Sequence, residues 1–136
     1  MTVGTAILAS LTVPGHPGQV RAARAFTATA LGDDHPCSAV AVLLVSELVT
    51  NSLLHSDSRL PGGKITITVT GSPNGARVEV RDAGGASVPV LEGPDDALAE
   101  GGRGLRLVSD LAAEWNYRRD TAGLVTWFEV RAEPPS

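Results

Sequence analysis

Cysteine is nearly absent from this sequence, in which Cys37 stands alone among 136 residues. A single cysteine excludes a disulfide within the chain and favours a reducing compartment, so we expect a cytoplasmic protein. Histidine is also scarce, with three copies in all. So few cysteines and histidines make a zinc site improbable, because a structural zinc ion usually takes four such ligands. We expect Cys37 to be a small buried or turn residue rather than a nucleophile.

The sequence also lacks an excess of positive charge and a long apolar run. Its formal net charge of -4 gives no general attraction to nucleic acid or to an anionic membrane. No segment approaches the roughly 20 apolar residues that cross a bilayer, and the N-terminus lacks the basic and apolar regions of a secretory signal. We therefore expect no membrane span, no direct nucleic-acid partner and no export.

The length of the chain fits one domain, and we assign residues 1–136 to it. Apolar residues that alternate with polar ones predict strands, and apolar residues at helical spacing predict helices. The predicted strands span residues 5–13, 64–70, 76–82, 115–120 and 124–130, and the predicted helices span residues 19–31, 37–56 and 104–115. This order predicts an α+β fold, a two-layer α/β sandwich in which about three helices cover one face of a mixed, mainly antiparallel sheet.

Two segments between these elements have the composition of turns and loops. Ser72-Pro73-Asn74-Gly75 predicts a hairpin turn between two of the strands. Residues 83–102 are rich in Gly, Pro, Asp and Ala and show no period. A loop this long inside a small domain is usually functional or mobile.

The second predicted helix contains the stretch "SELVTNSLLHS", in which Glu47, Asn51 and His55 lie four residues apart. At about 100° per residue, Asn51 lies near 40° and His55 near 80° from Glu47. The helix is otherwise apolar nearly all round, as buried helices are. The three polar side chains therefore predict a wall inside the protein that faces a ligand, with a structural carboxylate as the alternative.

The stretch "RVEVRDAGG" adds a second polar group. Val78, Val80 and Asp82 share one face of the predicted strand, so Asp82 continues the inward row. A carboxylate there suits a hydrogen-bond donor such as an exocyclic amine, and Gly84 and Gly85 let the backbone approach a ligand closely. The pattern Asp-x-Gly by itself describes a turn after a strand equally well.

The stretch "EGGRGLRLV" places glycines, Gly102 among them, immediately before a predicted helix that begins at Gly104. Backbone N–H groups at a helix N-terminus suit a phosphate, and glycine lets a loop wrap around it. Arg103 lies in the same stretch and could contact a phosphate oxygen, although a solvated loop arginine explains it equally well.

Together these motifs resemble the ATP-binding (Bergerat) fold of the GHKL superfamily, shared by gyrase, Hsp90, histidine kinases and MutL. The likeness is strongest to anti-sigma-factor serine/threonine kinases of the RsbW type, numerous in actinomycetes. By this resemblance, Glu47 would be the general base and Asn51 would hold Mg²⁺ at the phosphates, with His55 beside them. Asp82 would receive the adenine amine, and Gly84 would be the glycine that accompanies it.

The resemblance extends to the later motifs. Gly102, Arg103, Gly104 and Leu105 match the second glycine box, and residues 85–101 match the ATP lid. The family often ends with Thr-Val-Trp-Phe, where the threonine supports the adenine site. Here the order is Val-Thr-Trp-Phe, and Thr126 shares a face with Phe128, so we expect it to point inward.

The resemblance implies an ATP-binding (or ADP-binding), Mg²⁺-dependent serine/threonine protein kinase. Such a protein would sequester a sigma factor or another regulator, phosphorylate a serine on a STAS-type anti-anti-sigma antagonist, and form a homodimer. The alternative is a non-catalytic nucleotide-binding module that switches partners by closing its lid. A detached ATPase module and a structural domain without nucleotide are further alternatives.

Overall fold

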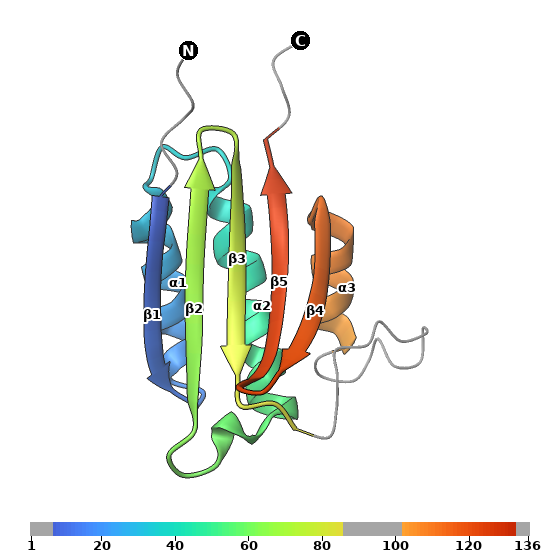
Figure 1. Ribbon diagram of the computed structural model, residues 1–136. Helices are drawn as coiled ribbons and strands as arrows, with labels where there is room; N and C mark the ends of the chain where they lie inside the picture. The colour runs from blue at the N-terminus through green and yellow to red at the C-terminus, as the bar shows by residue number, and fades with distance from the viewer. Residues whose placement is uncertain (1–6, 86–101, 133–136) are drawn as a thin grey trace.

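The computed structural model describes residues 7–85 and 102–132, and it contains the elements in the predicted order (Figure 1). The strands are β1 (Ile7–Pro14), β2 (Lys64–Ser72), β3 (Gly75–Asp82), β4 (Glu114–Asp120) and β5 (Gly123–Arg131). The helices are α1 (Gln19–Leu31), α2 (Ser38–His55), the 3-10 helix η1 (Asp57–Arg59) and α3 (Gly102–Leu111). The predicted α+β sandwich is confirmed, as is the hairpin turn between Ser72 and Gly75.

The five strands form one sheet in the order β1-β2-β3-β5-β4, and all four neighbouring pairs are antiparallel. Our prediction of a mixed sheet was wrong for the described strands. Two helices separate β1 from β2, so the chain returns to the end of the sheet that it left, and the two strands run in opposite directions (Figure 1). A single helix separates β3 from β4, which run in the same direction, but β5 lies between them.

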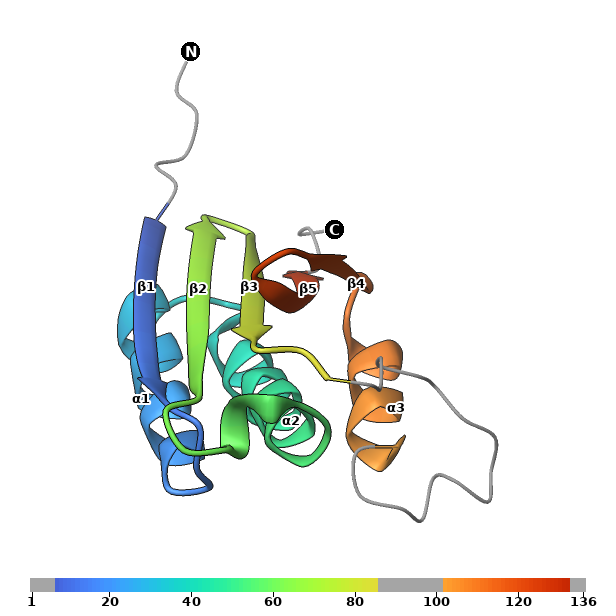
Figure 2. The same ribbon diagram turned by 60° about the horizontal axis from the view of Figure 1, so that its bottom comes forward.

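The helices cover one face of the sheet (Figure 2). Alternate residues of β2 and β3 are buried, which gives each strand an apolar row toward the helices. The core contains several completely buried side chains, among them Phe128, Leu44, Leu48, Ile65 and Ile67. Strand β1 begins, and strand β5 ends, at the end of the sheet opposite to Asp82 (Figure 1).

Helix α2 is the central element of the helical layer. By length and hydropathy alone it could cross a membrane. It contacts α1, α3 and β3 instead, and residues such as Leu44, Val45 and Leu48 are buried in these contacts. Its apolar composition is therefore explained by its position between neighbours on three sides.

The loop before α2 is anchored to the β2–β3 hairpin. The Nε2 atom of His35 lies 2.6 Å from the Ser72 carbonyl oxygen, and the Cys37 N–H donates to Nδ1 of His35 over 3.0 Å. Cys37 is buried, as we predicted, and burial raises the pKa of its thiol. A buried thiol that stays protonated is a poor nucleophile.

Helix α3 is shorter than predicted. It ends at Leu111, and the Ala113 N–H donates to the Glu129 carbonyl oxygen over 2.8 Å. Pairing of β4 with β5 begins at Glu114, so Trp115 belongs to a strand and not to the helix. The sequence around Ala112 and Ala113 favours a helix, and strand pairing with β5 overrides that propensity.

The turn between β4 and β5 lies against the end of β3. Gly123 has φ +143°, and a Cβ at this position would overlap the Asp82 carbonyl oxygen. Gly62 also has a positive φ, +84°, but its Cβ would meet nothing within 4 Å. Both positions need a residue that adopts a positive φ. Only Gly123 must also lack a Cβ to fit against β3.

We expect Gly62→Ala to lower the free energy of unfolding by about 1–2 kcal/mol, because alanine is strained at positive φ. Gly123→Ala should cost about 3 kcal/mol or more, because the overlap with Asp82 adds to the strain. Urea unfolding of both variants measures the difference. Equal losses would show that the approach of the turn to β3 contributes nothing.

Candidate functional site

Three segments that are far apart in the sequence meet where β3 ends. They are the last turns of α2 with η1, the residues Asp82–Gly85, and the turn from β4 to β5 (Figure 1). We call this region the Asp82 end of the sheet. Four of the sequence-predicted site residues, Asn51, His55, Asp82 and Gly84, lie here.

Asp82 is turned inward, as we predicted, and its side chain is 4% exposed. The Gly84 N–H donates to its Oδ1 over 2.7 Å, and the Ser52 hydroxyl of α2 also donates to the carboxylate. Burial raises the pKa of Asp82, while these two hydrogen bonds and the charge of Arg119 oppose the rise. The site therefore holds a carboxylate that is largely withdrawn from water and oriented from two sides.

Sequence analysis did not identify Ser52. It is 3% exposed and connects α2 to the end of β3 through Asp82. The helical wheel directed attention to the polar line at every fourth residue, and Ser52 lies outside that line. The only sequence feature that marks Ser52 is a small hydroxyl side chain inside an otherwise apolar helix. That feature points to a site residue only once the carboxylate opposite it is known.

Asn51 directly precedes Ser52, so the two Cα atoms lie about 3.8 Å apart. Its side chain is 7% exposed. No hydrogen bond of its amide occurs within residues 7–85 and 102–132, and no fully buried side-chain nitrogen or oxygen there lacks a partner, so the amide atoms of Asn51 reach the protein surface. An amide with these properties is suited to bind a ligand or an ion.

The three polar residues of α2 differ in their surroundings. Glu47 is half-buried, and no ion pair or hydrogen bond of its side chain occurs within residues 7–85 and 102–132. His55 is exposed, so our prediction of an interior wall was right for Asn51 and wrong for His55. His55 is the last residue of α2, where the helix passes the edge of the core.

The backbone after Asp82 is held by η1. The Ala83 N–H donates to Oγ of Ser58 over 2.8 Å, and the Asp57 N–H donates to the Gly84 carbonyl oxygen over 2.7 Å. Ser58 is completely buried and also donates to the Lys64 carbonyl oxygen over 2.7 Å. Gly84 has φ +78°, which explains why a glycine stands there. Ser58 was also missed, because its partners are set by tertiary structure.

Thr126 lies next to Asp82 on the inner face of the sheet. It is 2% exposed, which confirms that it points inward. Asp82 pairs with Leu124 across β3 and β5, and Thr126 is two residues further along the same face. Such diagonal neighbours lie roughly 7–8 Å apart, within reach of one small ligand.

The second glycine motif differs from the sequence-based expectation. Helix α3 begins at Gly102, so Gly102, Arg103 and Gly104 belong to its first turn and do not precede it. Leu105 is 3% exposed and packs in the core, so a direct contact of its side chain with a ligand is not supported. Residues 86–101 of the predicted ATP lid lie outside the described residues.

Comparison with known proteins identifies the architecture. A family model described as the histidine kinase-like ATPase domain matches residues 13–130. The chain belongs to this family. Membership in the ATPase-domain family implies an ATP-binding site, and the Asp82 end of the sheet has the buried polar groups that such a site needs.

The ATPase-domain chain is also similar to the crystal structure of the RsbU and RsbW domains of Rv1364c from Mycobacterium tuberculosis. The sequence identity is 21% and the TM-score is 0.60. The match covers 94% of this chain and 34% of that chain, so it supports the shared GHKL-like fold. A comparison with curated protein sequences gave no match.

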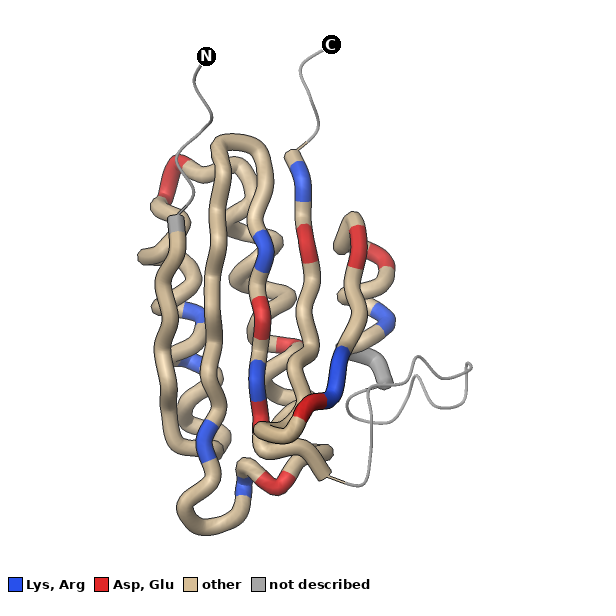
Figure 3. The backbone as a smooth tube through the Cα atoms, viewed as in Figure 1, with Lys and Arg blue, Asp and Glu red and all other residues tan. Residues whose placement is uncertain are grey.

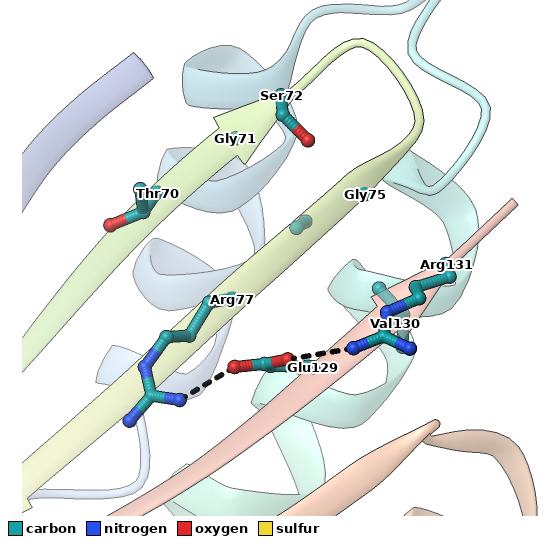
Figure 4. Close-up of a pocket in the computed structure, with 9 residues that line it drawn as sticks. Thr70, Gly71, Ser72, Gly75, Arg77, Glu129, Val130 and Arg131 are labelled. Atoms are coloured by element: carbon teal, nitrogen blue, oxygen red, sulfur yellow. Dashed lines mark hydrogen bonds and ion pairs between the residues drawn. The ribbon is translucent and has the colours of Figure 1, made fainter. Parts of the chain in front are cut away.

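A hollow lies at the end of β3 opposite to Asp82 (Figure 4). Its volume is about 220 Å³, and it is lined by Thr70, Ser72, Arg77, Glu129 and Arg131, among others. Arg77 and Arg131 both form ion pairs with Glu129, and Arg77 also lies 4.0 Å from the centre of the Trp127 ring. These charges belong to the rows along β3, β5 and β4 (Figure 3), so we interpret the hollow as part of a solvated face.

The raised pKa of Asp82 predicts how stability depends on pH. The folded protein binds the Asp82 proton more tightly than the unfolded chain does, so the free energy of unfolding falls as pH rises from about 4 through the raised pKa. The Asp82→Asn variant does not titrate at this position and can still accept from Gly84. We expect it to become more stable relative to wild type across that pH range.

Urea unfolding of both proteins between pH 4 and pH 7 measures this difference. Asp120→Asn is the matched control, because the ion pair with Arg81 lowers the pKa of Asp120 to about 2, the opposite direction. A stability difference between Asp82→Asn and wild type that stays constant with pH would contradict the prediction.

Proposed function

We propose that the Asp82 end of the sheet binds ATP and that the protein is a serine/threonine kinase in a partner-switching system. The observation that carries the proposal is the Asn51 amide, which reaches the surface from a residue that is 7% exposed, has no described partner and lies one residue from the serine that contacts Asp82. Family membership supplies ATP as the ligand that fits these groups.

Asp82 would bind the adenine base. A carboxylate accepts hydrogen bonds, and the exocyclic amine of adenine donates them. Ser52 and Gly84 occupy part of the carboxylate's accepting capacity and fix its orientation, which leaves at least one lone pair for the base. The buried Thr126 hydroxyl lies on the same inner face and would support the base or a bridging water.

Asn51 would bind the phosphate end through Mg²⁺. The described residues hold no cluster of three or more His, Cys, Asp or Glu side chains that suits a metal. A magnesium ion here would therefore take most of its ligands from phosphate and water, as it commonly does with nucleotides, and one from the Asn51 oxygen. The metal would offset the negative charge of the phosphates.

Glu47 would act as the general base. It lies one helical turn, about 6 Å, before Asn51 on α2 and has no described ion pair that would compete for its carboxylate. The carboxylate would accept the proton of a serine hydroxyl on the acceptor protein. The serine oxygen would then attack the γ-phosphorus, the bond to the β,γ-bridging oxygen would break, and ADP would leave.

The partners that we propose are a small STAS-type antagonist as the phosphate acceptor and a sigma factor or another regulator as the sequestered protein. The support is the fold likeness to a chain that contains an RsbW domain. A non-catalytic nucleotide switch would use the same Asp82 and Asn51 contacts but would not need Glu47 as a base.

We expect Asn51→Ala to weaken binding of Mg-ATP by about 10- to 100-fold, the loss typical of one interaction with a charged group. Isothermal titration calorimetry measures the affinity. The matched control is Asn116→Ala, since Asn116 is exposed on β4 and should not affect the nucleotide. The ATP site would have to lie elsewhere if Asn51→Ala bound Mg-ATP as tightly as wild type.

We expect Glu47→Gln to lower phosphate transfer to serine by about 10²- to 10⁴-fold while Mg-ATP affinity stays within about twofold of wild type. Labelled ATP and candidate antagonist proteins give the rate, and Glu114→Gln, an exposed residue of β4, is the control. Wild-type protein that binds ATP without labelling any serine would favour the non-catalytic switch. Label on a histidine of this chain would contradict the proposed reaction.

A further inference from the structure

Arg119 of the edge strand β4 reaches across to the backbone that follows Asp82. Its Nη1 donates to the Gly85 carbonyl oxygen over 3.1 Å. The same nitrogen lies 3.4 Å from the point where a Cβ on Gly84 would stand. The guanidinium group therefore lies beside both glycines.

The other hydrogen bonds to this backbone come from the opposite side. Ser58 accepts from Ala83, Asp57 donates to Gly84, and all of these groups belong to η1 or to β3's own end. Arg119 comes from the β4–β5 hairpin, so residues 83–85 are held between η1 and this hairpin. Beyond the pairing of Asp82 with Leu124, the other described hydrogen bonds of this segment come from η1 or from Asp82 itself.

Arg119 also acts on Asp82 electrostatically. Its charge lowers the pKa of Asp82, against the larger effect of burial, which raises it. Asp57 is the other charged group that acts on this carboxylate, and its charge raises the pKa. The ionised form of Asp82, which accepts a hydrogen bond from an amine, is therefore favoured by the cation on β4.

From this geometry we propose that Arg119 is a positioning residue that determines the preference of the site for a 6-amino purine over a 6-oxo purine. It would hold the Gly84–Gly85 backbone beside the base and favour Asp82 as an acceptor. This inference rests on the proposed ATP site and adds to it the residue that sets base selectivity. An ionised Asp82 attracts the amine of adenine and repels the 6-oxo group of hypoxanthine.

The test compares Mg-ATP with Mg-ITP, which has hypoxanthine in place of adenine. We expect Arg119→Gln to weaken ATP binding about tenfold and ITP binding much less, so that the ATP/ITP affinity ratio falls. The pH at which ATP affinity is half-maximal should move upward, because Asp82 takes up its proton more readily without the cation. Calorimetric titrations between pH 5 and pH 8 measure both effects.

Two further variants separate the contributions of charge and geometry. Arg119→Lys keeps the charge but not the planar fork of donors, so it should retain the wild-type pH profile and lose part of the ATP affinity. Arg118→Gln is the matched control, since Arg118 is the neighbouring residue on β4 and pairs with Glu79, 3.5 Å away. Both affinities of Arg118→Gln should stay within about twofold of wild type.

An Arg119→Gln protein with the wild-type ATP/ITP ratio and the wild-type pH profile would overturn the inference and leave the ATP site intact. Equal losses for ATP and ITP without a pH shift would also overturn it, because they would indicate a purely structural role. Wild-type protein that binds neither nucleotide would refute the proposed function itself, and the inference with it. Thermal unfolding of each variant confirms that the fold is retained.

Discussion

The hydrogen bond from the Ser52 hydroxyl to the Asp82 carboxylate connects the helical layer to the sheet, and the geometry of the candidate site depends on it. A buried carboxylate is costly unless it is hydrogen-bonded, so this contact and the Gly84 N–H make an inward Asp82 tolerable. Because Asn51 precedes Ser52, the amide lies one residue from the group that contacts the carboxylate.

The burial of Asp82 illustrates a conflict between stability and binding. The raised pKa means that the charged form of this residue is less favoured in the folded protein than in the unfolded chain. An apolar or amide side chain would fill the position with less penalty. Sites that bind ligands commonly keep such unfavourable groups, because the ligand supplies the missing partner.

The sequence was sufficient to predict the parts of the fold that depend on local periodicity. The two-residue period of β3 correctly turned Asp82 inward, and the helical period of α2 correctly buried Asn51. The same helical period wrongly predicted that His55 is buried. A period gives the direction of a side chain but not how far the helix extends beyond the core. Ser52, Ser58 and Arg119 could not be found from spacing, since their partners lie 25–34 residues away or on another layer.

The direction of the first and last strands of the chain has a consequence for proteins that carry several domains. β1 begins and β5 ends at the end of the sheet opposite to Asp82 (Figure 1). A domain joined at either side would therefore connect at the end of the sheet away from Asp82. The fold is thus suited to proteins in which such a domain is joined to others, as in the chain that contains RsbU and RsbW domains.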